Sequence, residues 1–387
     1  MLESFTTDHR KAKESGKKNH ARICMLTMRD IAKETYRSGF YEAQDVLCDI
    51  DDVDLISVRP RPACERIERF HRSIVWRDFT KTIASTNLAY QPIRLNKEYD
   101  VFILYVQYHA DLIQLAAVKD WKKRCKVSVL WIDEMWASVP PRLKSYLSVI
   151  NEFDYIVIGL EGTVSVLSDL LKRDCHWVPA GVDAIQFSPY PDFPCRVIDI
   201  YSMGRIWEDV HQTFRKYAMN NKLFYIYDTF HASLAKVKNY REHRELYAIM
   251  AKRSKYYFVS PAKMNTPWET QGQVEIGMRY YEGLAAGTVM IGQAPDCISF
   301  KETFNWPDAV IEIKPEGSDA YDVLKSLSSQ PERLLEISRR NAAEALLRHD
   351  WVYRWKKILE IAGLKPTQEL EMREGKLKRI AEEIEKV

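Results

Sequence analysis

Short apolar runs alternate along the chain with longer segments of helical periodicity. In the first half this pattern predicts strands at residues 22–28, 54–58, 101–105, 127–132, 155–158 and 177–178. The alternation starts again after residue 195, with strands predicted at residues 198–203, 224–227, 256–259, 289–291 and 309–313. Helices are expected between the strands, at residues 39–48, 110–124, 141–151 and 164–173 in the first half. Alternation of this kind is typical of parallel sheets covered by helices, so the sequence predicts an α/β fold.

A proline-rich segment separates the two halves. Four prolines fall within residues 179–194, and proline continues neither a helix nor a central strand. We therefore expect an N-terminal domain at residues 1–180, a linker at 181–195 and a second domain at 196–350. Residues 351–387 follow as a C-terminal extension.

The end of the chain carries a second pattern. Residues 367–387 are highly charged, and Leu377, Ile380, Ala381 and Ile384 have the spacing of one helix face. A docked amphipathic helix is the first interpretation. A peripheral contact with a membrane surface, or with a partner helix, is the second.

Composition limits the classes of protein to consider. The chain has 387 residues with a net charge of +3 and no long basic block, so nothing in it requires a nucleic-acid partner. Its seven cysteines form no C-x-x-C pair, which indicates reduced thiols and no zinc site. The first 19 residues have no apolar core of a signal peptide, and no uncharged apolar run approaches the roughly 18 residues that span a bilayer. We expect a cytoplasmic protein, with the inner face of the membrane as a second location.

The segment from residue 256 to residue 292 carries the strongest chemical signal. It reads as a strand, a polar loop, a helix containing Glu282, and a second strand. Such a βαβ unit directs a helix N-terminus, which favours anions, toward whatever the loop encloses. A carboxylate within that helix suits hydroxyl groups beside the anion. A ligand that carries a phosphate next to two hydroxyl groups is a nucleotide with its ribose.

Three motifs in order give the chain a family resemblance. They are Pro179-Ala-Gly-Val-Asp183 with Phe187-Ser-Pro189, Ser202-Met-Gly-Arg205, and Arg279-Tyr-Tyr-Glu-Gly-Leu-Ala-Ala-Gly287. Together they resemble GT-B glycosyltransferases of the "glycosyl transferases group 1", family 4-like type, including its spore-coat-like branch. The resemblance is strongest over residues 176–355.

This resemblance implies two Rossmann-like domains that face a cleft, with a C-terminal helix crossing back to the first domain. The N-terminal domain would bind the acceptor and the second domain the donor, a UDP- or GDP-linked sugar. The acceptor would be a hydroxyl of a glycan, a lipid-linked glycan or another glycoconjugate, as in polysaccharide biosynthesis. No metal and no redox cofactor is expected, and the oligomeric state is left open.

The resemblance also assigns the donor residues. Glu282 matches the second glutamate of an E-x7-E motif and would bind the ribose hydroxyls. Val274 stands where the first glutamate belongs, so Glu275, one residue later, is the candidate for contacting the sugar. Arg205, after Gly204, would neutralise the diphosphate. The lysine that often follows this arginine is absent, and Lys263 or Arg279 is expected to supply its charge, with surface ion pairs as the alternative. Residues from Thr270 to Gln273 would lie over the phosphates and offer hydrogen-bond donors.

The acceptor half offers two candidates at predicted strand ends. Asp133, followed by Glu134, would act as general base on the acceptor hydroxyl. A helix cap or a salt bridge is the alternative for Asp133. His109 is the second candidate, with a buried neutral histidine as its alternative.

Two other functions stay open at this stage. The departures at Val274 and after Arg205 allow a non-catalytic sugar- or nucleotide-binding structural protein. A nucleotide-sugar epimerase or hydrolase on the same fold is also compatible with these motifs.

Overall fold

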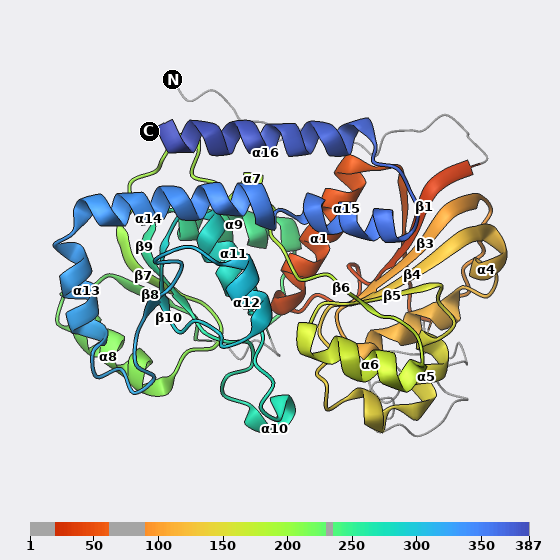
Figure 1. Ribbon diagram of the computed structural model, residues 1–387, viewed down its shortest axis with the longest axis horizontal. Coiled ribbons are helices and arrows are strands. Elements are labelled where there is room, and N and C mark those ends of the chain that lie inside the picture. Colours follow the sequence, from red (N-terminus) through yellow and green to blue (C-terminus); the bar gives the residue numbers. More distant parts are fainter. Residues whose placement is uncertain (1–19, 62–89, 230–234, 387) are drawn as a thin grey trace.

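The computed structural model describes residues 20–61, 90–229 and 235–386. Its strands form two separate sheets, each entirely parallel (Figure 1). The first sheet has the order β2-β1-β3-β4-β5-β6. Its strands are β1 (His20–Thr27), β2 (Val53–Ser57), β3 (Glu98–Val106), β4 (Cys125–Ile132), β5 (Tyr155–Ile158) and β6 (His176–Trp177). The second sheet has the order β11-β10-β9-β7-β8. Its strands are β7 (Ile198–Ser202), β8 (Tyr225–Tyr227), β9 (Ser254–Val259), β10 (Val289–Gly292) and β11 (Ile311–Glu312). The predicted α/β class is confirmed, and each predicted strand overlaps an observed one.

Both faces of the first sheet are buried, which explains its continuous apolar strands. Ile103 of β3 packs in the core on the side of α1 (Ser38–Ile50), whereas the next residue, Leu104, packs in the core on the opposite side. The helices on that opposite side are η2 (His109–Ala117), α4 (Trp121–Arg124), η3 (Pro140–Arg142), α5 (Lys144–Ile150), η4 (Glu161–Thr163) and α6 (Val164–Leu171). A short 3-10 turn, η1 (Thr35–Arg37), leads into α1.

The predicted helix at residues 110–124 is wrong in type. The segment forms the 3-10 helix η2 and then, after a break, the single turn α4. The break has a tertiary cause, because Val118 adopts an extended conformation and pairs with Ile93. The backbone N–H of Ile93 also donates to the carbonyl of Ala117 at 2.8 Å.

The second sheet is covered in the same way. Its helices are α8 (Glu208–Met219), α9 (Tyr240–Lys252), α10 (Pro267–Thr270), α11 (Met278–Ala285), α12 (Ile298–Thr303), α13 (Ala320–Ser328) and α14 (Pro331–Glu344). The segment between the sheets is less extended than its prolines predict, because it contains the helical turn α7 (Ala184–Phe187), capped by the side chain of Asp183.

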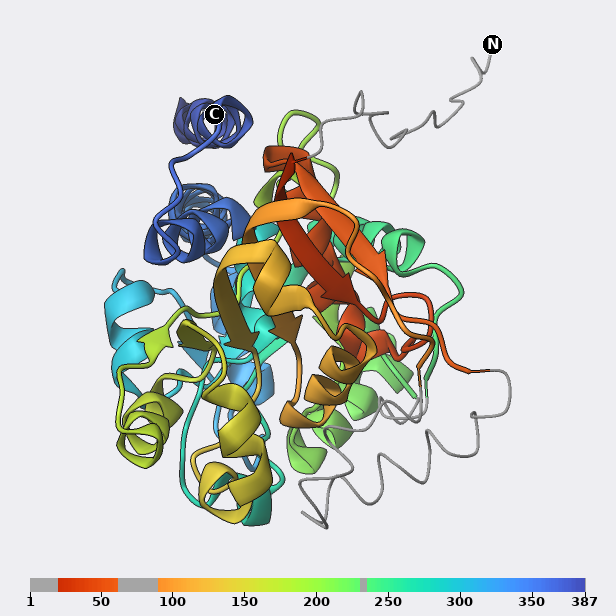
Figure 2. The ribbon, with the colours of Figure 1, turned by 90° about the vertical axis from the view of Figure 1, so that its right-hand side faces the viewer.

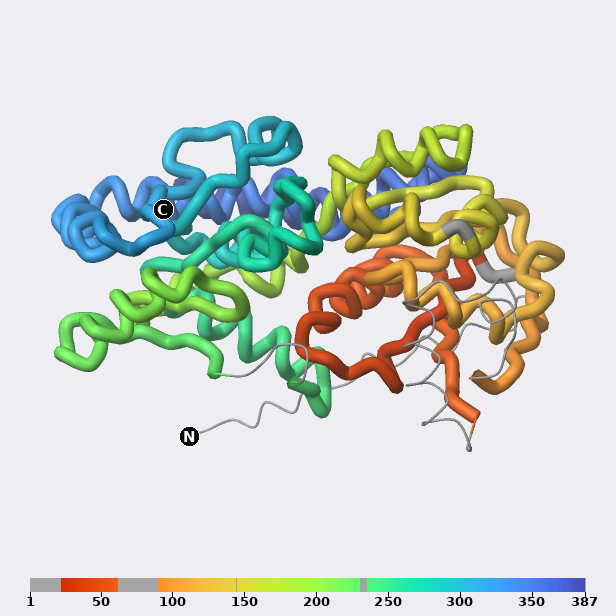
Figure 3. The backbone as a smooth tube through the Cα atoms, turned by 90° about the horizontal axis from the view of Figure 1, so that it is seen from below, coloured from red at the N-terminus to blue at the C-terminus, as the bar shows by residue number. Residues whose placement is uncertain are grey.

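After α14 the chain returns to the first half. A π-helical segment, η5 (Ala345–His349), leads into α15 (Trp351–Ile361), which packs on α1. The indole N–H of Trp355 donates to the carbonyl of Ala43 at 2.7 Å. One continuous apolar core therefore runs through both halves and includes Trp131, Trp351 and Tyr280. Seen from below, the halves lie side by side with these C-terminal helices behind them (Figure 3).

The last helix, α16 (Gln368–Lys386), lies across both halves and contacts α14, η5, α1 and α15 (Figures 1 and 2). Leu370, Leu377, Ala381 and Ile384 are buried, and Ile380 is half-buried. The prediction of a docked amphipathic helix is confirmed. The apolar face of this helix is covered by protein, and the alternative of a membrane contact stays a prediction. Among the described helices, none combines the length and the apolar character needed to cross a bilayer.

Candidate functional site

A pocket lies between the halves, lined by residues that follow the carboxyl ends of β4, β5 and β9. The carboxyl ends of parallel strands are where α/β folds bind ligands. From the first half the pocket is lined by Asp133, Glu134 and Trp177, and from the second by Glu275, Met278 and Tyr281. The lining contains three carboxylates and no lysine or arginine. Its chemistry therefore suits hydroxyl groups, which donate hydrogen bonds to carboxylates, better than phosphates.

Asp133 follows directly after β4 and enters this pocket. Burial, with a smaller contribution from the neighbouring charge of Glu134, raises the pKa of Asp133 to about 7. A carboxylate with such a pKa can accept a proton near neutral pH. The structure places Asp133 in the lining of the pocket, and its catalytic role stays a prediction.

His109 lies elsewhere. It begins η2, is buried, and packs edge-on against the ring of Tyr146 at 5.5 Å between centroids. Desolvation lowers its pKa to about 4, so the ring is neutral at physiological pH. His109 is not among the residues that line the pocket. The geometry therefore favours the alternative of a buried neutral histidine.

Glu275 reaches across the gap between the halves. Its Oε1 accepts a hydrogen bond from the backbone N–H of Gly162 at 2.8 Å and another from the side-chain amide of Gln273 at 2.6 Å. The carboxylate is almost fully buried, and burial raises its pKa. Glu275 lines the pocket, as its predicted contact with a sugar requires, but it also joins the two halves.

The loop between β9 and α11 makes further contacts of this kind. The ammonium of Lys263 lies 2.8 Å from Glu134 Oε1 and 2.6 Å from Glu269 Oε2. The ion-pair alternative for Lys263 is therefore the one observed, and its charge is already neutralised. Thr270 is buried in the turn α10, where its backbone N–H donates to the carbonyl of Thr266. We refer to residues 263–277 as the bridging loop.

The bridging loop is also fixed by Gln273, through contacts with the first half that the sequence did not predict. Its side-chain oxygen accepts from the backbone N–H of Ala137 at 2.8 Å, and its amide donates to Thr163 at 3.2 Å. A glutamine in a polar loop gives no sequence signal for such a contact, because its partners are more than 100 residues away.

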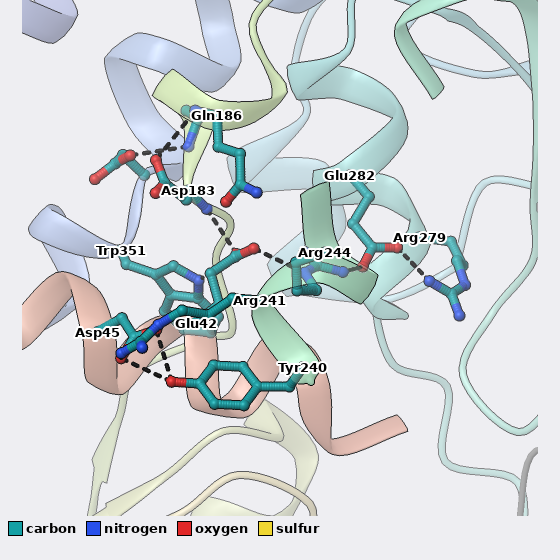
Figure 4. A network of polar contacts seen from close by, with 12 residues as sticks. Glu42, Asp45, Asp183, Gln186, Tyr240, Arg241, Arg244, Arg279, Glu282 and Trp351 are labelled. Atoms are coloured by element: carbon teal, nitrogen blue, oxygen red, sulfur yellow. Dashed lines mark hydrogen bonds and ion pairs between the residues drawn. The ribbon is translucent and has the colours of Figure 1, made fainter. Parts of the chain in front are cut away.

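Glu282 lies deeper, on α11, and its carboxylate is fully buried (Figure 4). One oxygen pairs with Arg244 of α9, and the other lies 2.5 Å from Arg279. These two cations hold the pKa of Glu282 below its usual value despite burial. The hydroxyl of Tyr257 donates to the carboxylate at 3.3 Å. The predicted carboxylate is thus ionised but occupied by protein donors rather than open to solvent, and its contact with ribose stays a prediction.

Arg279 connects Glu282 to the end of β7. Its side chain is 34% exposed and lies beside Gly204, where a Cβ atom would stand 3.5 Å from the guanidinium. Gly204 has φ +90°, a conformation that glycine adopts without strain. Arg205 is exposed and makes no ion pair within the described part of the chain. The fold therefore brings Gly204 and Arg279 together and leaves Arg205 available to an anion at the same strand end.

Each half also contributes one buried donor near this point. The hydroxyl of Ser38 on α1, in the first half, and the Nη2 of Arg244 on α9, in the second, have no hydrogen-bond partner among the described residues. Ser38 starts α1, and a Cβ atom at the adjacent Gly39 would stand 2.9 Å from the side chain of Met278. The N-termini of α1 and α11 therefore meet at the site, and both favour an anion.

Comparison with known proteins agrees with this architecture. Residues 235–360 match the family described as "Glycosyl transferase-like". No curated protein sequence matches the chain. Among solved structures, HepE of Anabaena in complex with UDP-glucose superposes with a TM-score of 0.50 at 9% identity, covering 89% of this chain and all of that one.

A second similar structure is an alpha-glucosyltransferase in complex with UDP and a 13-mer DNA containing a HMU base. It superposes with a TM-score of 0.52 at 11% identity, and the match covers 89% of this chain and 100% of that chain. At such identities the similarity concerns the fold alone. The fold is that of the GT-B glycosyltransferases, as the motifs predict. In the described residues no group of three or more histidine, cysteine or acidic side chains is arranged to hold a metal ion.

Proposed function

Because the chain has the GT-B fold, we propose that it is a glycosyltransferase that moves a sugar from a nucleotide-diphosphate sugar to a hydroxyl acceptor. One observation carries this proposal. The first turn of α11 separates two chemically different regions, with Met278 lining the acidic pocket and Arg279 lying beside Gly204. A sugar joined to a diphosphate needs both environments next to each other.

The donor would lie on the cationic side. Arg205 and Arg279 are placed to bind the diphosphate, whose negative charge grows as the glycosidic bond breaks. If Arg279 turns toward the phosphates, it leaves one oxygen of Glu282 free to accept hydrogen bonds from the ribose hydroxyls. The two solved structures named above contain UDP or UDP-glucose, which supports a UDP-linked donor; a GDP-linked sugar is tested beside it.

The donor sugar would extend into the acidic side, where the acceptor hydroxyl would meet it. Asp133 would remove the proton from the attacking hydroxyl, and Glu275 would orient a hydroxyl of the donor sugar. A glycan or a lipid-linked glycan carries hydroxyls of this type, and both fit a role in polysaccharide synthesis in the cytoplasm or at the inner face of the membrane. The proposed chemistry uses arginines and helix N-termini and needs no metal.

A thermal-shift screen tests the donor. We expect one of UDP-, GDP-, ADP- or CMP-linked sugars, added without metal, to raise the melting temperature by several degrees, since a ligand bound only to the folded state stabilises it. No shift with any of the four would contradict the proposal.

Turnover then separates the candidate functions. We expect release of free nucleotide only when a mixture of glycan acceptors is added. Release without an acceptor would instead identify a hydrolase, and conversion of the sugar without release an epimerase. Tight binding without turnover would favour a sugar-nucleotide-binding protein. This candidate is supported because Lys263 and Glu275 already bind protein groups, Glu134 and the backbone of Gly162.

A further inference from the structure

The two halves are connected by two segments that meet at one point. Val182, in the first connection, pairs with Asp350, in the second. The carboxylate of Asp350 is fully buried and accepts hydrogen bonds at 2.9 Å from the backbone N–H groups of Ala184 and Val352. Arg373 of α16 donates to both of its oxygens, at 2.8 and 2.7 Å. We call this meeting point the crossover.

Glu42 ties α1 to both strands of the crossover. Its Oε1 accepts from the backbone N–H of Asp183 at 2.8 Å and from the indole N–H of Trp351 at 3.0 Å. Asp183 belongs to the first connection and Trp351 to the second. Glu42 is 4% exposed, so the position of its carboxylate is fixed by these contacts.

Arg244 continues this chain of contacts to the proposed donor residue. Its Nε donates to Glu42 Oε2 at 2.7 Å, and its Nη1 pairs with Glu282 (Figure 4). The guanidinium therefore joins a carboxylate of the N-terminal half to one on α11. All three side chains are nearly inaccessible to water, so screening by solvent is weak and the geometry of the ion pairs matters.

Separation of the halves would break this chain at Glu42 and Arg244. Each group would then lose a charged partner while its own surroundings stay largely apolar, which is unfavourable. Conversely, a ligand that contacts Glu282 contacts a carboxylate that is paired with Arg244. Because Arg244 is also paired with Glu42 of the N-terminal half, the position of that half affects the ligand.

We propose that Glu42 and Arg244 are positioning residues, which couple donor binding at Glu282 to the arrangement of the two halves at the crossover. Neither residue touches the donor; they orient the carboxylate that does. Coupling of this kind is reciprocal, so that closure of the halves strengthens donor binding and the donor favours closure. The inference rests on the proposed function, because it requires a donor at Glu282.

The chain offers a matched control at Asp45, one turn after Glu42 on α1. Asp45 also joins the halves, through Tyr240 at 2.8 Å and Arg241 at 2.8 Å, both on α9 (Figure 4). Its contacts do not extend to Glu282. Loss of Asp45 therefore removes an interdomain ion pair without disturbing the proposed donor residue.

The experiment compares Glu42→Gln with Asp45→Asn in the full chain. The probe is the nucleotide sugar that shifts the wild-type melting temperature, and its dissociation constant is measured by calorimetry. We expect Glu42→Gln to weaken binding by about fivefold or more, and Asp45→Asn by less than about twofold. Small-angle scattering should show donor-induced compaction in the wild type and in Asp45→Asn, but a reduced change in Glu42→Gln.

A double-mutant cycle identifies the route of the effect. In a Glu282→Gln background, Glu42→Gln should have little further effect on donor affinity, because both act through the same carboxylate. Additive effects would overturn the coupling, as would equal affinities of Glu42→Gln and Asp45→Asn.

A conservative variant keeps the test valid if Glu42→Gln does not fold. Arg244→Lys retains the positive charge but has one ammonium in place of a fork that holds a carboxylate at each end. It should fold and lose donor affinity by a similar factor; unchanged affinity would overturn the proposal. A wild-type protein that binds none of the nucleotide sugars would instead contradict the proposed function itself.

Discussion

The pKa of each carboxyl group at this site depends on the groups around it. Asp133 is half-buried and Glu282 is buried, and their pKa values shift in opposite directions. Asp133 has no cation beside it, and its pKa rises to about 7. Glu282 lies between two arginines, and its pKa falls. At neutral pH the first can exchange a proton and the second stays charged, which matches the roles of base and binding group.

The first prediction concerns Glu282→Gln. The variant should weaken donor binding by about 1–3 kcal/mol, because a neutral amide replaces a charged acceptor of the ribose hydroxyls. It should also lower the melting temperature, since Arg244 and Arg279 lose their shared anion. Calorimetry with the identified donor measures the first effect and thermal unfolding the second.

Glu245→Gln is the control for this variant. Glu245 is exposed on α9, next to Arg244 in the chain, and its loss should change neither quantity. Wild-type donor affinity in Glu282→Gln would show that the ribose is bound elsewhere.

The second prediction concerns the pH dependence of transfer. Asp133 must be ionised to act as a base, and its pKa is about 7. The value of kcat/KM should therefore rise with pH and level off above about pH 8. Asp133→Asn should remove nearly all transfer while the affinity for the donor is retained. A pH profile of the wild type that is flat between pH 5 and 8 would contradict the assignment.

Asp133→Asn also has an expected effect on stability. The folded-state pKa of Asp133 is raised above the ordinary value of 3.8, so its contribution to stability is fully present below that pH and is lost as pH rises through about 7. The amide does not ionise and avoids this loss. The variant should therefore be more stable than the wild type at pH 8 and gain little at pH 4, as urea unfolding at the two values would show.

Among the elements, the bridging loop differs most from what its sequence suggests. A polar loop before α11 was expected to cover phosphates, yet its side chains hold the N-terminal half. Lys263, Gln273 and Glu275 each contact a residue of that half. The loop therefore holds the two halves together beside the pocket.

The third prediction tests the loop through Gln273→Ala. Loss of hydrogen bonds to Ala137 and Thr163 should destabilise the protein by about 1–3 kcal/mol, since the partner groups are partly buried. Hydrogen exchange within residues 263–277 should become faster. Gln271→Ala, which alters an exposed residue of the same loop, should leave both quantities unchanged; equal exchange in the two variants would show that Gln273 does not hold the loop.

For the whole molecule, the C-terminal helix and the crossover keep the two halves together. α16 packs on elements of both, and Arg373 links it to Asp183 and Asp350. One apolar core passes from one half to the other. The halves should therefore unfold together.

The fourth prediction is that Arg373→Ala lowers the free energy of unfolding by about 3–5 kcal/mol, because it leaves the fully buried carboxylate of Asp350 without its cation. Urea unfolding, followed by tryptophan fluorescence, should remain a single transition in the wild type. Arg379→Ala, an exposed position on the same helix, should change the stability by less than about 0.5 kcal/mol. A loss in Arg373→Ala no larger than in this control would contradict the role of the crossover.

The sequence by itself determined which segments form strands and how α16 docks. Both depend on local periodicity, since alternate residues of β3 fill opposite cores and Leu377, Ala381 and Ile384 share one face. It also placed Asp133 and Arg205 at strand ends, because the end of an apolar run marks the edge of a parallel sheet. The α/β class followed from these local signals, whereas the GT-B architecture was implied by the motifs that the chain shares with that family.

Only the tertiary structure decided which partners the charged residues take. Glu42 and Arg244 are 202 positions apart, and no local pattern in the sequence links them. Lys263 and His109 were assigned to the site from their positions, but one is neutralised by Glu134 and the other is buried against Tyr146. Ion pairs and burial depend on distances between segments that meet only after folding, and periodicity along the chain does not contain them.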